Sequence, residues 1–133
     1  MKRSAILAPL SREHHLALVW AKRARSYAAS DVESFAESLV SLFDATFEPH
    51  FRKEEGELPS LLVAQPHLIK RMLDEHELLR HQINLIRNGR RDLIGDFGLA
   101  MEQHVRFEER ELFPTIERSV GQSGTKQSVL PDE

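Results

Sequence analysis

Apolar residues recur along this chain at alternating spacings of three and four, the pattern of an amphipathic helix that buries one face. Stripes of this kind run through residues 7–28, 35–54, 69–86 and 97–112. Their members are Leu7, Leu10, His14, Ala17, Ala21, Ala24 and Ala28; Phe35, Leu39, Phe43, Phe47, His50 and Glu54; Ile69, Met72, His76, Leu79, Ile83 and Ile86; and Phe97, Met101, His104, Glu108 and Leu112. Four such helices predict an all-α, up-down-up-down four-helix bundle, because short connections make successive helices antiparallel.

Several residues predict where these helices begin and end. We expect Ser11 and Asp92 to cap the first and fourth helices. Residues 30–33, Ser-Asp-Val-Glu, should start the second helix as a capping box. Pro66 should open the third helix, and residues 88–89, Asn-Gly, should end it.

Two prolines fall inside the predicted helices. Pro49 should kink the second helix or displace a hydrogen bond one turn back, and Pro114 should bend or end the last turns of the fourth. The stripe of the first helix is largely alanine, so a neighbouring helix could approach closely there.

The length of 133 residues suits a single domain with one core. We expect the bundle to occupy residues 1–118. Residues 119–133 are polar, rich in small side chains and without periodicity, so we expect them to form a disordered tail.

Composition and charge narrow the classes of function. A net charge of -3 gives no overall attraction to nucleic acid or to an acidic membrane. The absence of cysteine excludes disulfides, zinc-thiolate sites, iron-sulfur clusters and thiol nucleophiles, so any metal must be held by nitrogen and oxygen. No apolar run is long enough for a signal peptide or a membrane span. These features favour a cytoplasmic protein.

Each of the four stripes carries one histidine, and two of them also carry a glutamate. His50 and Glu54 are four residues apart, as are His104 and Glu108, so each pair shares a helix face. A single histidine on an apolar stripe is more often an ordinary core residue than a ligand. Burying four imidazoles and two carboxylates together would be costly without partners, however, and a metal compensates all six at once. The predicted metal ligands are His14, His50, Glu54, His76, His104 and Glu108. Iron, manganese and zinc all suit these ligands.

The other polar candidates have weaker claims. His15 adjoins His14 but lies off the stripe, so the pattern leaves a choice between the two for the first helix. His67 and His81 are expected at the surface. Glu55 and Glu109 directly follow the predicted ligands and point roughly 100° away, which suits support of a ligand or exposure.

Other metal and catalytic motifs are missing from the chain. It has no Glu-x-x-His spacing of the ferritin-like di-iron bundles, no His-Glu-x-x-His motif of zinc proteases, no phosphate-binding loop and no Gly-x-Ser-x-Gly elbow. We therefore assign no catalytic residues and no organic cofactor site.

Four segments, LSREHHLALV, HFRKEEGELP, MLDEHELLR and HVRFEERELFP, together resemble the hemerythrin-like domains, also called HHE cation-binding domains, over most of residues 7–118. The resemblance implies a four-helix bundle around two iron ions in a non-haem centre. It makes the four histidines terminal nitrogen ligands, with Glu54 and Glu108 as bridges between the irons.

The sequence departs from the oxygen-carrying hemerythrins at two positions. Those proteins have a fifth histidine four residues after the third-helix ligand, where this chain has Arg80. They also carry an aspartate where Glu109 stands, whereas His104-x-x-x-Glu108 follows the HHE form. A site with four histidines leaves more positions open to exchange, which suits binding or sensing of oxygen, peroxide or nitric oxide.

Two alternative functions stay open from the sequence. One is a di-iron oxidoreductase or an iron-handling or repair protein, although the repair proteins that resemble this domain carry an extra cysteine-bearing segment. The other is a helical interaction module whose histidines hold zinc or nothing. Metal content separates this last alternative from the others.

Overall fold

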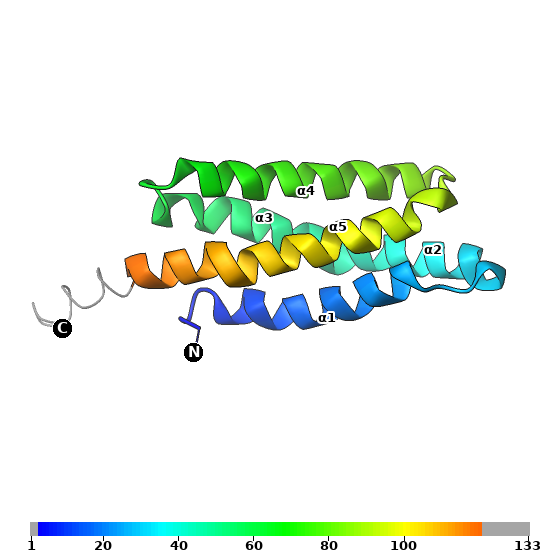
Figure 1. Cartoon of the computed structure of the whole chain (residues 1–133), viewed down its shortest axis with the longest axis horizontal. Coiled ribbons are helices and arrows are strands. Elements are labelled where there is room, and N and C mark those ends of the chain that lie inside the picture. Colours follow the sequence, from blue (N-terminus) through cyan, green and yellow to red (C-terminus); the bar gives the residue numbers. More distant parts are fainter. Residues whose placement is uncertain (1–2, 121–133) are drawn as a thin grey trace, which may run out of the picture.

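The computed structural model describes residues 3–120, and every regular element among these residues is helical. The helices form an up-down-up-down four-helix bundle, in which the second helix is divided into α2 and α3 (Figure 1). This confirms the fold predicted from the spacing of apolar residues. Within the described part of the chain, no helix combines the length and apolar character needed to cross a membrane.

The first helix, α1, spans Ala8–Arg25 and begins earlier than its sequence signals suggest. Its N-cap is Leu7, Pro9 lies in its first turn, and the hydroxyl of Ser11 donates to Glu109 instead of capping the helix. A short 3-10 turn, Ala29–Asp31, then leads into α2, which spans Val32–Leu42. The capping box predicted at residues 30–33 is absent, because Glu33 pairs with Arg91 instead.

Both prolines inside the helices are preceded by a π-helical turn. The first turn, Phe43–Phe47, ends two residues before Pro49 and joins α2 to α3, Glu48–Glu57. The second, Glu108–Leu112, ends two residues before Pro114. In each turn the closing N–H bonds a carbonyl five residues back, so the displaced hydrogen bond predicted for Pro49 is confirmed.

The second half of the bundle consists of α4, Pro66–Arg87, and α5, Ile94–Phe107. Pro66 opens α4 as predicted, and Gly89, at φ 111°, ends it in a conformation that favours glycine. Asp92 does not cap α5. It lies in the 3-10 turn Arg91–Leu93, where it pairs with Arg90.

The last helix does not end at Pro114. After the second π turn, residues 113–120 remain helical, two residues beyond the predicted end of the bundle at 118. The rest of the predicted tail, residues 121–133, lies outside the described residues. A further 3-10 turn, Pro59–Leu61, follows α3.

The apolar interior is divided into two clusters by a polar layer. Along α1, Leu10 belongs to one cluster and Ala17 to the other, with His14 between them. Along α4, Met72 and Leu79 flank His76 in the same way. The histidines therefore lie at one level of the bundle, with buried apolar side chains above and below.

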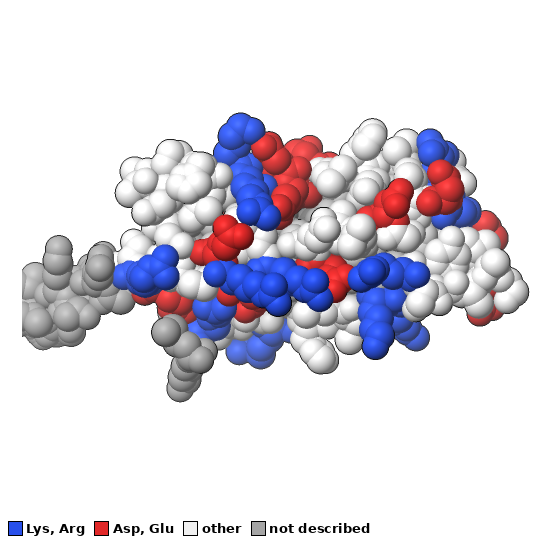
Figure 2. Space-filling model, in the orientation of Figure 1, with Lys and Arg blue, Asp and Glu red and all other residues white. Residues whose placement is uncertain are grey.

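Helices α1 and α5 approach closely through small residues. A Cβ atom added to Gly98 would lie 2.7 Å from the backbone oxygen of Ala21 and 2.9 Å from the Cβ of Ala24. This confirms the close approach predicted from the alanine-rich stripe. Lys and Arg side chains form a band over this pair of helices, and Glu102 pairs there with both Arg25 and Arg106 (Figure 2).

Candidate metal centre

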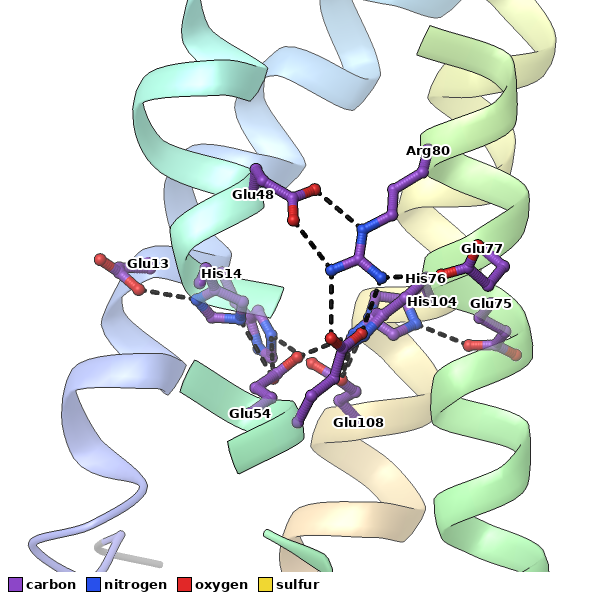
Figure 3. A network of polar contacts seen from close by, with 12 residues as sticks. Glu13, His14, Glu48, Glu54, Glu75, His76, Glu77, Arg80, His104 and Glu108 are labelled. Atoms are coloured by element: carbon purple, nitrogen blue, oxygen red, sulfur yellow. Dashed lines mark hydrogen bonds and ion pairs between the residues drawn. The ribbon is translucent and has the colours of Figure 1, made fainter. Parts of the chain in front are cut away.

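Six polar side chains converge in the layer between the two apolar clusters (Figure 3). They are the six predicted ligands: His14, His50, Glu54, His76, His104 and Glu108. All are buried, with exposed fractions between 0 and 6%. Each comes from a helix stripe that the rest of the core fixes in place.

The six side chains form two overlapping groups of four. The first, which we call site A, contains His14, His50, Glu54 and Glu108, and the second, site B, contains His76, His104 and the same two glutamates. Within each group, one candidate ligand atom per residue lies within 4.8 Å of the others. Two histidines per site and two shared carboxylates form a nearly symmetric pair of sites.

Site B contains four buried polar atoms that have no hydrogen-bond partner. They are Glu54 Oε1, His76 Nε2, His104 Nε2 and Glu108 Oε2, one from each member of the site. His76 Nε2 and Glu54 Oε1 are 2.9 Å apart, and His104 Nε2 and Glu108 Oε2 are 3.0 Å apart, yet neither pair has the geometry of a hydrogen bond. Buried groups without partners are rare because each costs free energy. A cation among these four atoms would remove that cost, so the residues fit a metal.

The other ring nitrogen of each histidine contacts a carboxylate from a different helix. Nδ1 of His14 donates to Glu109 at 2.6 Å, and Nδ1 of His50 donates to Glu13 at 2.6 Å. Nδ1 of His76 donates to Glu55 at 2.7 Å, and Nδ1 of His104 donates to Glu75 at 2.7 Å. We call Glu13, Glu55, Glu75 and Glu109 the outer carboxylates.

The outer carboxylates connect the helices in a closed ring. Glu13 of α1 accepts from a histidine of α3, and Glu55 of α3 accepts from a histidine of α4. Glu75 of α4 accepts from a histidine of α5. Glu109, in the π turn that follows α5, accepts from His14 of α1 and so closes the ring. A carboxylate on Nδ1 fixes each ring's orientation and directs Nε2 towards the centre, where it can bind a metal.

The inner groups strongly shift one another's pKa values. Burial raises the pKa of Glu54, and the neighbouring Glu108 raises it further. Burial alone would also raise the pKa of Glu108, but His104 and the other histidines outweigh it and hold this pKa well below its usual range. Burial lowers the pKa of His104, while the attraction of Glu108 and the contact with Glu75 outweigh that effect and raise the pKa to about 9.

Arg80 lies beside site B but is directed towards carboxylates. Its guanidinium donates to Glu48 at 2.8 and 3.0 Å, to Glu55 at 2.9 and 3.2 Å, and to Glu77 at 2.9 Å (Figure 3). Burial lowers the pKa of Arg80, but these hydrogen bonds outweigh that effect and raise it. Arg80 therefore contacts site B indirectly, because Glu55 also accepts from His76.

A small cavity of about 10 Å³ lies beside the histidines of site A. Its lining contains His14, His50, His104, Glu13 and five apolar residues, namely Ala17, Phe47, Phe51, Met101 and Val105. The volume is about that of one water-sized probe. The cavity places a largely apolar space next to the candidate metal ligands.

The structure separates the six predicted ligands from the remaining histidines. His14 is buried and faces Glu108, whereas the adjacent His15 is exposed, so of the two only His14 lies in the buried cluster. His67 and His81 are exposed as expected. Glu55 and Glu109 accept from histidines of other helices, His76 and His14.

Two outer carboxylates, Glu13 and Glu75, were not predicted from the sequence. Each directly precedes a predicted ligand on its own helix, His14 or His76. Each supports a histidine on the next helix of the ring, however, so spacing along one helix does not indicate its role.

A comparison with known families identifies one match. The model of the hemerythrin HHE cation binding domain matches residues 5–116. No curated protein and no solved structure matches the chain. The matched region contains all six inner residues and all four outer carboxylates, so the buried cluster coincides with a domain described as cation-binding.

Proposed function

This chain belongs to the hemerythrin HHE cation-binding domain family, and from that premise we propose that it is a non-haem di-iron protein. Its centre binds or senses a small ligand such as oxygen, peroxide or nitric oxide. The observation that carries the proposal is the pair of four-residue groups that share both glutamates. Shared carboxylates suit two metals about 3.5 to 4 Å apart.

The donor set supports iron over metals that prefer sulfur or purely oxygen ligands. Each site offers two imidazole nitrogens and two carboxylates. Iron, manganese and zinc accept such ligands, and iron supplies the one-electron chemistry needed to respond to oxygen or nitric oxide. His50, His76, His104 and His14 would bind through Nε2, while Glu54 and Glu108 would span both positions.

The protein's own residues also support a small-molecule role. The outer carboxylates hold each Nδ1 proton, which keeps the rings from turning. The cavity beside site A has room for about one water-sized molecule, which suits a ligand of two or three atoms. Arg80 stands on α4 where the oxygen-carrying hemerythrins have a further histidine, and its guanidinium is bound by Glu48 and Glu55. Site B therefore receives no third imidazole from this position.

An anaerobic titration tests the proposal. Chelator-treated protein is titrated with Fe(II), and we expect binding to saturate at two ions per chain. Nitric oxide added to the loaded protein should then produce a new visible absorption band. Replacing His50 with alanine should reduce the band, because it removes one of the two imidazoles of site A.

Two outcomes of this titration would contradict the proposal, and a separate zinc competition supplies a third. Saturation below two Fe(II) ions per chain would exclude a di-iron centre. Binding of two ions with no spectral response to nitric oxide, oxygen or peroxide would leave a metal-binding bundle without the proposed ligand chemistry. Preference for zinc over iron in a competition titration would favour the interaction module instead.

A further inference from the structure

The two sites differ in how well their atoms are compensated without a metal. We propose that site A exchanges its metal readily and site B retains its metal, and that Glu13 is the positioning residue that sets the exchange rate. This inference rests on the proposed di-iron function and extends it. Three independent features of the described residues support it.

The first feature is the hydrogen bonding of the inner atoms. In site A, His14 Nε2 contacts Glu108 Oε1 at 2.7 Å, and His50 Nε2 contacts Glu54 Oε2 at 3.1 Å, both with hydrogen-bond geometry. In site B, by contrast, one atom of every member lacks a partner. Emptying site A leaves its inner atoms hydrogen-bonded. In empty site B, His76 Nε2 and Glu54 Oε1 lie 2.9 Å apart, and His104 Nε2 and Glu108 Oε2 lie 3.0 Å apart, but without hydrogen-bond geometry, so the cost of burying these atoms is only partly compensated.

The second feature is the set of ion pairs that arginines form with the outer carboxylates. In site B, Glu55 is bound by Arg80 at 2.9 Å and Glu75 by Arg71 at 2.9 Å. In site A, Glu109 is bound by Arg3 at 2.9 Å. Glu13 is different, because it forms no ion pair with a lysine or arginine among residues 3–120.

Exposure strengthens the difference at Glu13. Its side chain is 46% exposed, whereas those of Glu55, Glu75 and Glu109 are 23%, 24% and 28% exposed. Glu13 can therefore leave His50 by turning into solvent without breaking a second ion pair. When it leaves, the ring of His50 loses the contact that fixes its orientation.

The third feature is access from outside the bundle. His14 and His50 are 4% and 6% exposed, whereas His76 and His104 are 0% and 1% exposed. The small cavity of the centre reaches both histidines of site A and also Glu13, but only His104 of site B. A metal or chelator that approaches through this region meets site A first.

A chelator competition experiment tests this difference. The full chain is loaded anaerobically with two Fe(II) ions and mixed with an excess of a chromophoric Fe(II) chelator, and the colour of the chelate is followed in time. We expect two phases of about one iron each. The fast phase reports site A and the slow phase reports site B.

Matched variants assign the two phases. Glu13→Gln keeps the size of the side chain but removes its charge, so we expect the fast phase to accelerate about tenfold or more while the slow phase stays unchanged. Glu75→Gln makes the same change at His104 and should accelerate only the slow phase. Thermal melting of the two loaded variants reports any general loss of structure, which would accelerate both phases.

His50→Ala supplies a second assignment that does not depend on Glu13. It removes a ligand of site A, so we expect one slowly released iron to remain. Release of both irons from the wild-type protein in one phase would overturn the inference, as would acceleration of the slow phase by Glu13→Gln. Loading of fewer than two irons would instead overturn the di-iron function on which the inference rests.

Discussion

Arg80 donates to Glu55 at 2.9 Å, and the same Glu55 oxygen accepts from Nδ1 of His76. Arg80, which stands where the oxygen-carrying hemerythrins have a fifth histidine, thus contacts a histidine of site B through one carboxylate. Its charge also neutralises Glu48, which lies on α3 about two turns before Glu55. Arg80 has a structural role that a metal ligand at this position would not have.

Removing this charge should destabilise the protein. Arg80→Gln leaves Glu48, Glu55 and Glu77 close together without their shared cation, and we expect a loss of about 1–3 kcal/mol in the free energy of unfolding. Chemical denaturation measures it. Arg52→Gln is the control, because among residues 3–120 Arg52 pairs only with Glu48, and its side chain is 76% exposed. An equal effect of both substitutions would show that the Arg80 network is not special.

Alanine substitutions should separate ligand histidines from surface histidines. His104→Ala removes one of two imidazoles from site B, so the purified protein should lose at least one iron per chain. His81→Ala should keep the full iron content, because His81 is exposed and belongs to neither site. Elemental analysis of both proteins gives the answer, and metal loss in His81→Ala alone would refute the assignment.

Chelator-treated protein should become less stable as the pH rises from about 6.5 to 9. The pKa of His104 is raised to about 9 by Glu108 and Glu75, against the effect of burial. A raised histidine pKa adds stability that is complete below the unfolded value of about 6.5 and is lost as the pH passes through 9. The raised pKa of Glu54 acts in the same direction.

Melting temperatures measured across this pH range test the effect. The raised pKa of His104 accounts for a decrease in the free energy of unfolding on the order of 3 kcal/mol across this pH range. Iron-loaded protein should show a much flatter profile, since the metal replaces the protons of the centre. A melting temperature of the chelator-treated protein that rises between pH 6.5 and 9 would contradict the raised pKa of His104.

The contact between α1 and α5 should tolerate no side chain at Gly98. Gly98→Ala places a Cβ against the backbone of Ala21 and the side chain of Ala24, so the helices must separate, at a cost of about 1–3 kcal/mol. Gly95→Ala is the matched control on the same helix, because nothing lies within 4 Å of its added Cβ. It should be neutral or stabilise the protein by up to about 1 kcal/mol. Chemical denaturation of both variants measures the difference, and equal stability of the two would contradict the close helix contact.

The sequence predicts the inner part of the centre well because that part depends on helix periodicity. His50 and Glu54, or His104 and Glu108, share a face at a spacing of four, and the apolar stripe fixes which face is buried. Burial of His14 over His15 follows from the same stripe. The order of the helices follows from their short connections.

The outer part could not be predicted in this way. Glu13 supports His50 across the interface of α1 and α3, and such a contact depends on the rotation and height of two helices. The caps predicted for the first and fourth helices are also wrong, because Ser11 and Asp92 bind other side chains instead of capping, whereas the predicted start at Pro66 is confirmed. A capping side chain can bond either to the helix backbone or to another side chain, and Ser11 and Asp92 bond to other side chains.

The metal content of protein purified without an affinity tag tests the central claim most directly. Elemental analysis of the full chain, produced in iron-supplemented medium, should give two iron ions per chain and little zinc or manganese. Two irons would agree with the paired sites that share Glu54 and Glu108. One iron or fewer per chain, or zinc in its place, would contradict the di-iron assignment.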